Sequence, residues 1–295
     1  MQNSGGKIVR DFVITVNSTV DMPKEWLEER DIKVVPLRYT IDGTTYVDME
    51  GLSAKEFFNK LREGKMSVTS QVNPDEAKEA LEKYVKEGKD ILHLAFTSAL
   101  SGTYNSMRLA AEELREEYPE AKIIIVDTLC ACMGEAVLAY YAYEMKKAGK
   151  TMDEIAQWVE DNKLRVGHQV TVDDLHHLHR GGRLSKTSAI VGSMVKIKPI
   201  LIVNDEGKLV VAAKERGRKK SISTIVNMVA ERMEEGDKEI AFVTHGDCVE
   251  EAEYLASLLK EKVGVKEVLV NNIGTVIGSH TGPGVLAVFH MGNKR

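Results

Sequence analysis

The chain has 295 residues, 43% of them hydrophobic and 29% charged, a composition typical of a globular protein with one large domain or two smaller ones. Its formal net charge of −5 at pH 7 excludes a general attraction to nucleic acid or to membrane surfaces, so any anion site has to be built locally. No apolar run is long enough to span a bilayer, and the N-terminus lacks the apolar segment of a signal peptide.

Cysteines are few. Cys130 and Cys132 form a single C-x-C pair, and Cys248 lies far away in the sequence. This odd, sparse count favours reduced thiols, so we expect a cytoplasmic protein. Because no apolar run is long enough to span a bilayer, we expect no stable membrane insertion. Because no second pair of ligands accompanies the C-x-C, we expect no zinc site.

Apolar runs alternate with amphipathic segments through the first half of the chain. The runs predict strands over 12–16, 33–37, 91–96 and 122–127, and a hairpin turning at Asp42 and Gly43. Helix starts are indicated by Ser53 with Glu56, Asn73 with Pro74, and Thr151 with Glu154, and by helical patterns from about Ser101 and Met133. This alternation is typical of a doubly wound, mostly parallel sheet.

The second half has a different order of elements. It predicts a short helix, a hairpin turning over 205–208, a helix over 221–235, a strand over 239–245, another helix, and strands over 267–271 and 285–289. We therefore expect an N-terminal α/β domain over residues 7–165 and a C-terminal α+β domain over residues 166–295.

Three polar segments follow predicted strands or precede predicted helices. SALSGTY, residues 98–104, puts Ser101 at an N-cap position, where free backbone N–H groups can bind an anion, although an ordinary cap without a ligand is equally compatible. TSQ, residues 69–71, adds hydroxyls but alone is most typical of a solvated loop. NSTVDMP, residues 17–23, lies at the carboxyl end of a strand, where open α/β sheets place ligands.

The segment IGSHTGPG, residues 277–284, surrounds one histidine, His280, with hydroxyls and glycines. Taken alone it favours a tight turn between two strands. The alternative is a rigid polar cradle, in which glycine allows close approach to a ligand.

Two arginines, Arg180 and Arg183, flank a diglycine within DDLHHLHRGGRLS, residues 173–185. Guanidinium groups beside flexible backbone can clamp a phosphate or a carboxylate, but arginines are also common where a helix ends in glycine. His176 and His179 share a helix face, yet no carboxylate or cysteine completes a metal set at ligand spacing, so no metal is expected.

These segments together resemble the DegV family of bacterial fatty-acid-binding proteins. NSTVDMP, TSQ, SALSGTY, DDLHHLHRGGRLS with the following KIKPIL, and IGSHTGPG with the following VLAVF occur in the family's order, from Asn17 to Phe289. The resemblance implies two α/β domains with a long-chain, palmitate-like fatty acid buried between them. It also implies partnership with the catalytic subunit of a separate fatty acid kinase, which phosphorylates the bound carboxylate.

The resemblance assigns roles residue by residue. It implies that Thr69, Ser101 and His280 hold the carboxylate, that Ser98, Gly102 and Thr281 are their neighbours, and that Arg180 and Arg183 face the acyl phosphate or the kinase. Hydroxyl and N–H donors suit a carboxylate, and an imidazolium at His280 would add a positive charge.

This chain departs from the family pattern at a few positions. Asn17 stands where the family usually has Asp, Ala99 breaks the usual run before Leu100, and the histidines around His177 are not a family feature. None of these changes removes an implied carboxylate contact. The neutral Asn17 speaks against any role that needs a charge there.

The sequence thus favours a non-catalytic fatty-acid carrier without a cofactor. The alternative is a serine hydrolase acting on a lipid or acyl ester, with Ser98 or Ser101 as nucleophile and His280 as base. The chain has no G-x-S-x-G elbow, and no acid can be assigned to orient the histidine, which favours the carrier.

Overall fold

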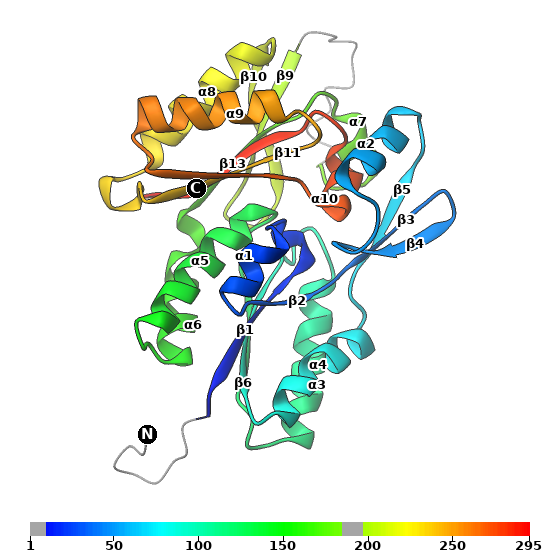
Figure 1. Cartoon of the computed structure of the whole chain (residues 1–295), viewed down its shortest axis with the longest axis vertical. Coiled ribbons are helices and arrows are strands. Elements are labelled where there is room, and N and C mark those ends of the chain that lie inside the picture. The colour runs from blue at the N-terminus through cyan, green and yellow to red at the C-terminus, as the bar shows by residue number, and fades with distance from the viewer. Residues whose placement is uncertain (1–9, 185–196) are drawn as a thin grey trace.

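The computed structural model describes residues 10–184 and 197–295 (Figure 1). Its first sheet has four parallel strands in the order β2-β1-β6-β7, namely Lys33–Val35, Phe12–Asn17, Asp90–Ala95 and Ile123–Asp127. Helices α3 (Pro74–Lys86) and α4 (Thr103–Glu117) lie on one side of it, and α5 (Met133–Lys147) and α6 (Met152–Asn162) lie on the other. A short helix, α1 (Lys24–Glu29), follows the first strand. The predicted doubly wound parallel sheet is confirmed.

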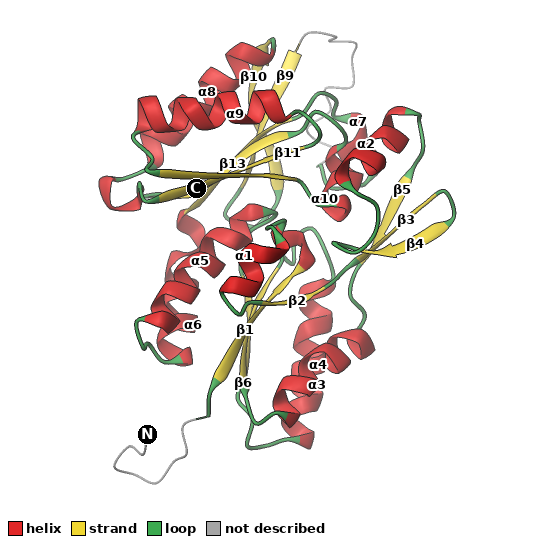
Figure 2. Ribbon diagram, viewed as in Figure 1, coloured by secondary structure: helices red, strands yellow, loops and turns green. Residues whose placement is uncertain are grey.

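The second sheet has six strands in the order β10-β9-β8-β13-β11-β12. In chain order these are β8 (Val166–Thr171), β9 (Ile197–Val203), β10 (Leu209–Arg216), β11 (Ile240–His245), β12 (Glu267–Asn272) and β13 (Leu286–Met291). Only β11 and β12 pair in parallel, and helices α8 (Arg218–Arg232) and α9 (Val249–Leu258) cover one face (Figure 2). The predicted α+β character of the second half is confirmed.

A third, antiparallel sheet was predicted only in part. Strands β3 (Arg38–Ile41) and β4 (Thr44–Val47) form the expected hairpin, and Asp42 and Gly43 at its turn have φ angles of 52° and 74°, as a type I′ turn requires. The TSQ segment is not a solvated loop, because Thr69 lies in β5 (Ser67–Ser70), which pairs with β3. The strand was not predicted there because the residues of TSQ are all polar and lack the apolar pattern of a buried strand.

Strand β8 was also missed, although it lies in the middle of the second sheet and all six of its residues are buried. Its central residues are Gly167, His168 and Gln169, which break the apolar pattern of a buried strand. The structure pairs part of these polar groups internally: His168 Nδ1 lies 3.0 Å from Val166 O, and Gln169 Oε1 lies 3.1 Å from His290 Nε2. Among the described residues, Gln169 Nε2 has no hydrogen-bond partner.

Helix α8 begins three residues before its predicted start. Gly217 is the single residue between strand β10 and helix α8. Its φ of 88° lets the chain turn directly into the helix at Arg218.

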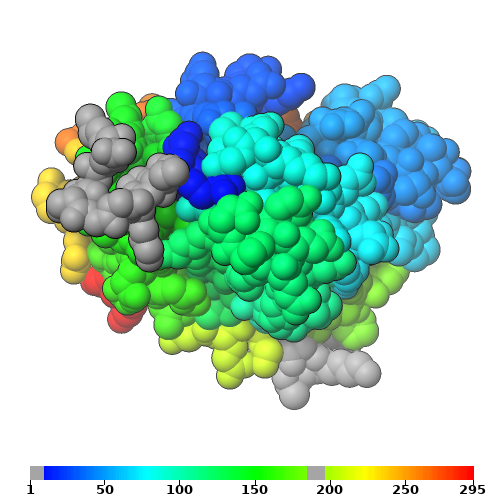
Figure 3. Space-filling view, turned by 90° about the horizontal axis from the view of Figure 1, so that it is seen from below, coloured from blue at the N-terminus to red at the C-terminus, as the bar shows by residue number. Residues whose placement is uncertain are grey.

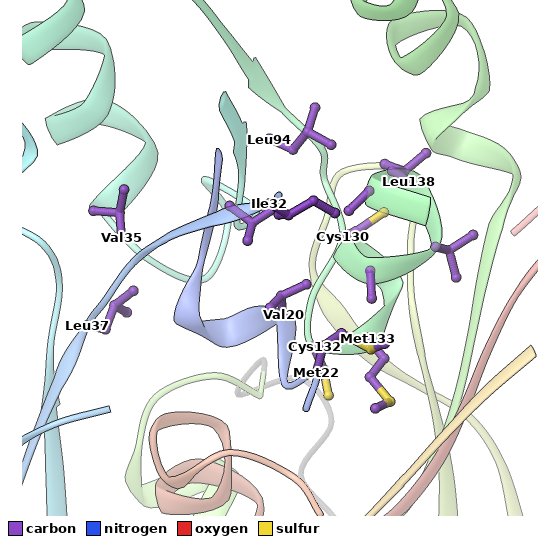
Figure 4. Close-up of a cluster of buried hydrophobic side chains, with 14 of the residues drawn as sticks. Val20, Met22, Ile32, Val35, Leu37, Leu94, Cys130, Cys132, Met133 and Leu138 are labelled. Atoms are coloured by element: carbon purple, nitrogen blue, oxygen red, sulfur yellow. The ribbon is translucent and has the colours of Figure 1, made fainter. Parts of the chain in front are cut away.

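One hydrophobic core runs through both halves of the chain. It includes Val16 and Leu94 from the first sheet and Phe289 from the second, and α5 contacts strands of both sheets. Figure 4 shows part of this core, where Cys132 and Met133 lie at the start of α5. The boundary expected after residue 165 falls where β8 begins, and it stays a prediction. The first residues of the expected N-terminal domain, 7–9, lie outside the described residues.

Residues near α3 and α4, coloured cyan to blue-green, form much of the molecular face in Figure 3. Within residues 10–184 and 197–295, no helix is both long enough and apolar enough to cross a bilayer.

Buried histidines make the stability of this fold sensitive to acid. Burial lowers the pKa of His290 to about 4, so it stays neutral in the folded chain but becomes protonated below about pH 6.5 when the chain unfolds. Its contribution to the free energy of unfolding is present above pH 6.5 and is lost as the pH falls toward 4. When the pH is lowered from 7 to 5, the free energy of unfolding of His290→Gln should therefore fall by about 2 kcal/mol less than that of the wild type.

Urea unfolding of both proteins at the two pH values measures this difference. Buried carboxyls such as Glu135, whose pKa is raised by burial, make the free energy of unfolding rise as the pH falls. They do so equally in both proteins, so the comparison with the wild type cancels their contribution. Equal losses in the two proteins would contradict the neutral, buried state of His290.

Candidate functional site

A cavity of about 390 Å³ lies between the carboxyl end of the first sheet, the second sheet and helix α10 (Thr275–Thr281). This volume is within the range of small-molecule sites in proteins, roughly 300–1,000 Å³. Most of its wall is apolar and comes from both halves of the chain, including Leu37, Phe96, Val170, Leu209, Val276 and Phe289. The cavity therefore suits a ligand with a substantial apolar part.

Polar side chains gather in the part of the wall built by β5, the start of α4, the end of α10 and the segment after α7 (His176–Arg180). Of the residues expected from the sequence, the cavity is lined by Thr69, Ser101, Gly102, Arg183, His280 and Thr281. The neighbouring Ser70 and Gln71, together with Gly102, are exposed, so this polar part lies toward the surface.

The IGSHTGPG segment is mainly helical, which corrects the expected tight turn between two strands. Helix α10 includes His280, and the turn is confined to Gly282, Pro283 and Gly284, where the two glycines have φ angles of 75° and 77°. Gly278 lets the helix pack closely, because a Cβ there would lie 3.0 Å from both Phe57 and Phe58. The glycines needed for packing gave the segment the composition of a turn.

Helix α10 and strand β5 are joined by two hydrogen bonds between side chains. Thr69 Oγ1 lies 2.8 Å from His280 Nε2, and Ser67 Oγ lies 2.7 Å from Ser279 Oγ. Thr69 and His280 are more than 200 residues apart in sequence, yet they form one continuous polar surface at the cavity.

The surroundings of His280 favour its neutral form. Burial lowers the pKa of His280 to about 4, and the nearby Arg183 guanidinium contributes to the shift. The imidazolium considered from the sequence stays a prediction for the ligand-bound protein. Its Nδ1 is buried and has no hydrogen-bond partner within the described part of the chain. When Nε2 carries the proton it donates to Thr69, which leaves the threonine hydroxyl free to donate to a ligand.

Ser101 lies one position earlier than expected relative to its helix. Helix α4 begins at Thr103 with Gly102 as its N-cap, and Ser101 Oγ accepts a hydrogen bond of 3.2 Å from Thr103 N. A Cβ on Gly102 would lie 2.1 Å from Gln71 Oε1, so any larger residue at this position would require the glutamine side chain to move. The serine thus caps the helix start and lines the cavity at the same time.

The two arginines of the R-G-G-R segment have separate positions. Arg183 lines the cavity and donates from Nε to Leu100 O at 3.1 Å, which joins its segment to the SALSGTY loop. Arg180 is exposed, contacts His177 Nδ1 at 2.9 Å and does not line the cavity. Ser185 at the end of this motif, and Lys196 at the start of KIKPIL, lie outside the described residues.

Ser98 does not reach the cavity. Its side chain is exposed, and its backbone N–H donates to Asp127 Oδ1 at 3.2 Å. The hydrolase alternative has little geometric support, because the hydrogen bond of His280 goes to Thr69 rather than to Ser101. No carboxylate within residues 10–184 and 197–295 hydrogen-bonds to the other nitrogen of His280.

Several polar residues of the cavity wall were not among the site residues expected from the sequence. They are Thr19, Cys132 and His168, together with Ser70 and Gln71 of the TSQ segment. Thr19 Oγ1 donates to Glu135 at 3.3 Å, and Cys132 Sγ donates to Asp21 Oδ2 at 2.9 Å. Their hydrogen-bonding groups are turned to the protein, so they add little polarity toward a ligand. The NSTVDMP motif was a signal for Thr19, but no sequence pattern indicated His168.

Within the described residues, no group of three or more histidine, cysteine or acidic side chains is placed to hold a metal ion.

The packing of Gly181 against the imidazole can be tested directly. A Cβ at this position would lie 2.3 Å from His280 Nδ1, so Gly181→Ala should displace the ring and break its bond to Thr69. The displaced ring becomes more hydrated, so its pKa rises from about 4 toward 6.5. NMR of the imidazole at pH 5.5 should show a neutral ring in the wild type and partial protonation in the variant.

Gly236→Ala is the matched control, because a Cβ at Gly236 has no atom within 4 Å. An imidazole signal that is the same in Gly181→Ala, Gly236→Ala and the wild type would contradict this geometry.

The sequence profile of a family described as "Uncharacterised protein, DegV family" matches residues 11–293. A DegV domain-containing protein of Clostridium perfringens is 51% identical over 97% of this chain and 99% of its own length. The crystal structure of DegV from Bacillus subtilis, called a fatty acid binding protein, is 30% identical, with a TM-score of 0.85 over 96% of this chain and 100% of its own. A DegV family protein of Ruminococcus gnavus, with vaccenic acid, is 25% identical with a TM-score of 0.85 over 94% and 99% of the two chains. The chain belongs to the DegV family.

Proposed function

We propose that this protein binds a long-chain fatty acid in the cavity, with its carboxylate at Thr69, Ser101 and His280. The observation that carries the proposal is the division of one cavity into a polar part near the surface and an apolar wall. The relatives that are described as fatty acid binding or contain vaccenic acid support it.

The apolar wall provides most of the binding free energy in this proposal. Burial of a methylene group contributes roughly 0.8 kcal/mol, so a tail of about sixteen carbons contributes on the order of 10 kcal/mol. The wall residues from the second sheet, such as Val170 and Phe289, enclose the tail together with Phe96 from the first half.

The polar part fixes the orientation of the ligand. Thr69 and Ser101 donate from their hydroxyls to the carboxylate, and Arg183 at the same wall supplies a positive charge. His280 acts mainly through its 2.8 Å hydrogen bond to Thr69, which sets the direction of that hydroxyl. A bound carboxylate also favours protonation of His280, so loading raises the pKa of the imidazole.

The protein acts in this proposal as a carrier and not as a catalyst. It presents the carboxylate, which lies near the surface, to the catalytic subunit of a separate fatty acid kinase in the cytoplasm. Arg180 is exposed and lies three residues before Arg183 of the cavity wall, and in this proposal it contacts that partner or the acyl phosphate.

Two serines of one motif allow a matched test of binding. Ser101→Ala removes a proposed carboxylate donor, whereas Ser98→Ala removes an exposed hydroxyl outside the cavity. With lipid-free protein, the dissociation constant for palmitate should rise about tenfold in Ser101→Ala, equivalent to one lost hydrogen bond to a charged group, and stay within twofold in Ser98→Ala.

Displacement of a fluorescent fatty acid gives the constants, and native mass spectrometry counts the bound acyl chains. Absence of any acyl chain from the wild type would refute the proposed function. Equal effects of the two substitutions would refute the assigned orientation.

The proposed roles of the two arginines predict different effects on palmitate binding and on phosphorylation. Arg180→Ala should leave the palmitate dissociation constant unchanged and reduce phosphorylation by the kinase, because this side chain lies outside the cavity. Arg183→Ala should weaken both, since it removes a charge from the cavity wall. Titration calorimetry and a phosphoryl-transfer assay separate the two effects, and unchanged transfer in Arg180→Ala would disprove its role.

A further inference from the structure

Helix α10 carries His280 but is too short to be stable alone. It has seven residues, and isolated helices of this length do not form in water, because nucleation is unfavourable. Its N-cap is Gly274, which has no side chain to accept a hydrogen bond from the first turn. The position of the helix therefore depends on groups from other segments.

Asp48, in the segment after β4, supplies an acceptor at the start of α10. Its Oδ1 accepts a hydrogen bond of 2.7 Å from the hydroxyl of Thr275, the first residue of the helix. The backbone of Asp48 is held as well, because its N–H donates to Leu37 O at 3.0 Å and the next residue, Met49, has a φ of 67°. The side chain is only 1% exposed, so this carboxyl has little access to water as an alternative partner.

A second carboxyl lies at the same end of the helix. Asp21 packs against Gly274 so closely that a Cβ there would lie 2.1 Å from Asp21 Oδ1. Burial raises the pKa of both carboxyls, so their contribution at the start of the helix comes from hydrogen bonding and packing. Both carboxyls come from the N-terminal half, although α10 belongs to the C-terminal half.

The opposite end of α10 is attached to the same part of the chain. Ser279 and His280 bond to Ser67 and Thr69 of β5, and β4 and β5 both pair with β3. Figure 1 shows α10 beside this three-stranded sheet. The helix thus bridges from Asp48 to Thr69, and a displacement at its first residue moves His280 relative to Thr69.

We propose that Asp48 is a positioning residue for the ligand carboxylate: by holding Thr275 it fixes the helix that brings His280 to Thr69. Asp48 does not itself line the cavity. This inference rests on the proposed function and extends it to a residue outside the cavity that acts through the helix.

Thr275→Val is the main test, because it removes the hydroxyl at nearly constant volume. Thr224→Val is the matched control, since the Thr224 hydroxyl also donates to a carboxylate, Glu215, at 2.9 Å, but on α8 and away from the cavity. The palmitate dissociation constant should rise at least fivefold in Thr275→Val and stay within twofold in Thr224→Val. Near-ultraviolet circular dichroism establishes that each variant is folded at the temperature of measurement.

A double-mutant cycle separates positioning from general destabilisation. In a His280→Gln background the effect of Thr275→Val should fall below twofold, because the group that the helix positions has been removed. Asp48→Ala should reproduce the effect of Thr275→Val, and Thr275→Val decides the matter if Asp48→Ala does not fold.

Two results would overturn the inference while leaving the proposed function in place. One is palmitate affinity in Thr275→Val equal to that in Thr224→Val. The other is independent, multiplicative losses from Thr275→Val and His280→Gln. Failure of the wild type to bind palmitate would instead refute the proposed function, and the inference with it.

Discussion

The buried polar loop after the first strand is the constraint on which the cavity depends. Asn17 Oδ1 accepts a hydrogen bond of 3.0 Å from Phe96 N, and its backbone N–H donates to Glu135 at 2.9 Å. Asn271, in the other half of the chain, donates from Nδ2 to Asp21 O at 2.8 Å. Breaking a buried hydrogen bond leaves its partners unsatisfied, so these bonds fix two strand ends, the start of α5 and the end of β12 relative to one another. The cavity lies where these elements meet.

This constraint gives the NSTVDMP motif a structural role in this chain, although only its Thr19 lines the cavity wall. It also explains how the chain accommodates Asn17. Burial raises the pKa of Glu135, and the nearby Asp21 adds to the shift, so the region already holds more carboxyl groups than it can easily ionise. A neutral amide at position 17 keeps the acceptor for Phe96 without adding a further buried charge.

Local sequence signals predicted much of the fold. The capping pair Ser53 with Glu56 is present as expected, as are the pairs that begin α3 and α6, because a cap depends on residues within one turn. Strand β8 and helix α10 were missed because tertiary contacts stabilise them. His168 of β8 accepts a hydrogen bond from Ala131 N at 3.2 Å, and Gly278 of α10 packs between two phenylalanines.

The site could be predicted only through family resemblance. The sequence alone left SALSGTY undecided between a cap and an anion site, and it favoured a loop for TSQ and a turn for IGSHTGPG, because nothing local brings Thr69 to His280. That contact depends on the pairing of β5 with β3 and on the docking of α10, which are long-range features. Resemblance also assigned Ser98 to the site, and the structure places it on the surface, since adjacent residues of a loop can point to different sides.

In the proposed complex one cavity holds a fatty acid with its carboxylate at the polar part. A crystal structure of the protein loaded with palmitate would show this arrangement. We expect continuous, elongated electron density, with the carboxylate within hydrogen-bonding distance of Thr69 Oγ1 and Ser101 Oγ and the tail against Val170 and Phe289. An empty cavity, or a carboxylate located beside Cys132, would contradict it.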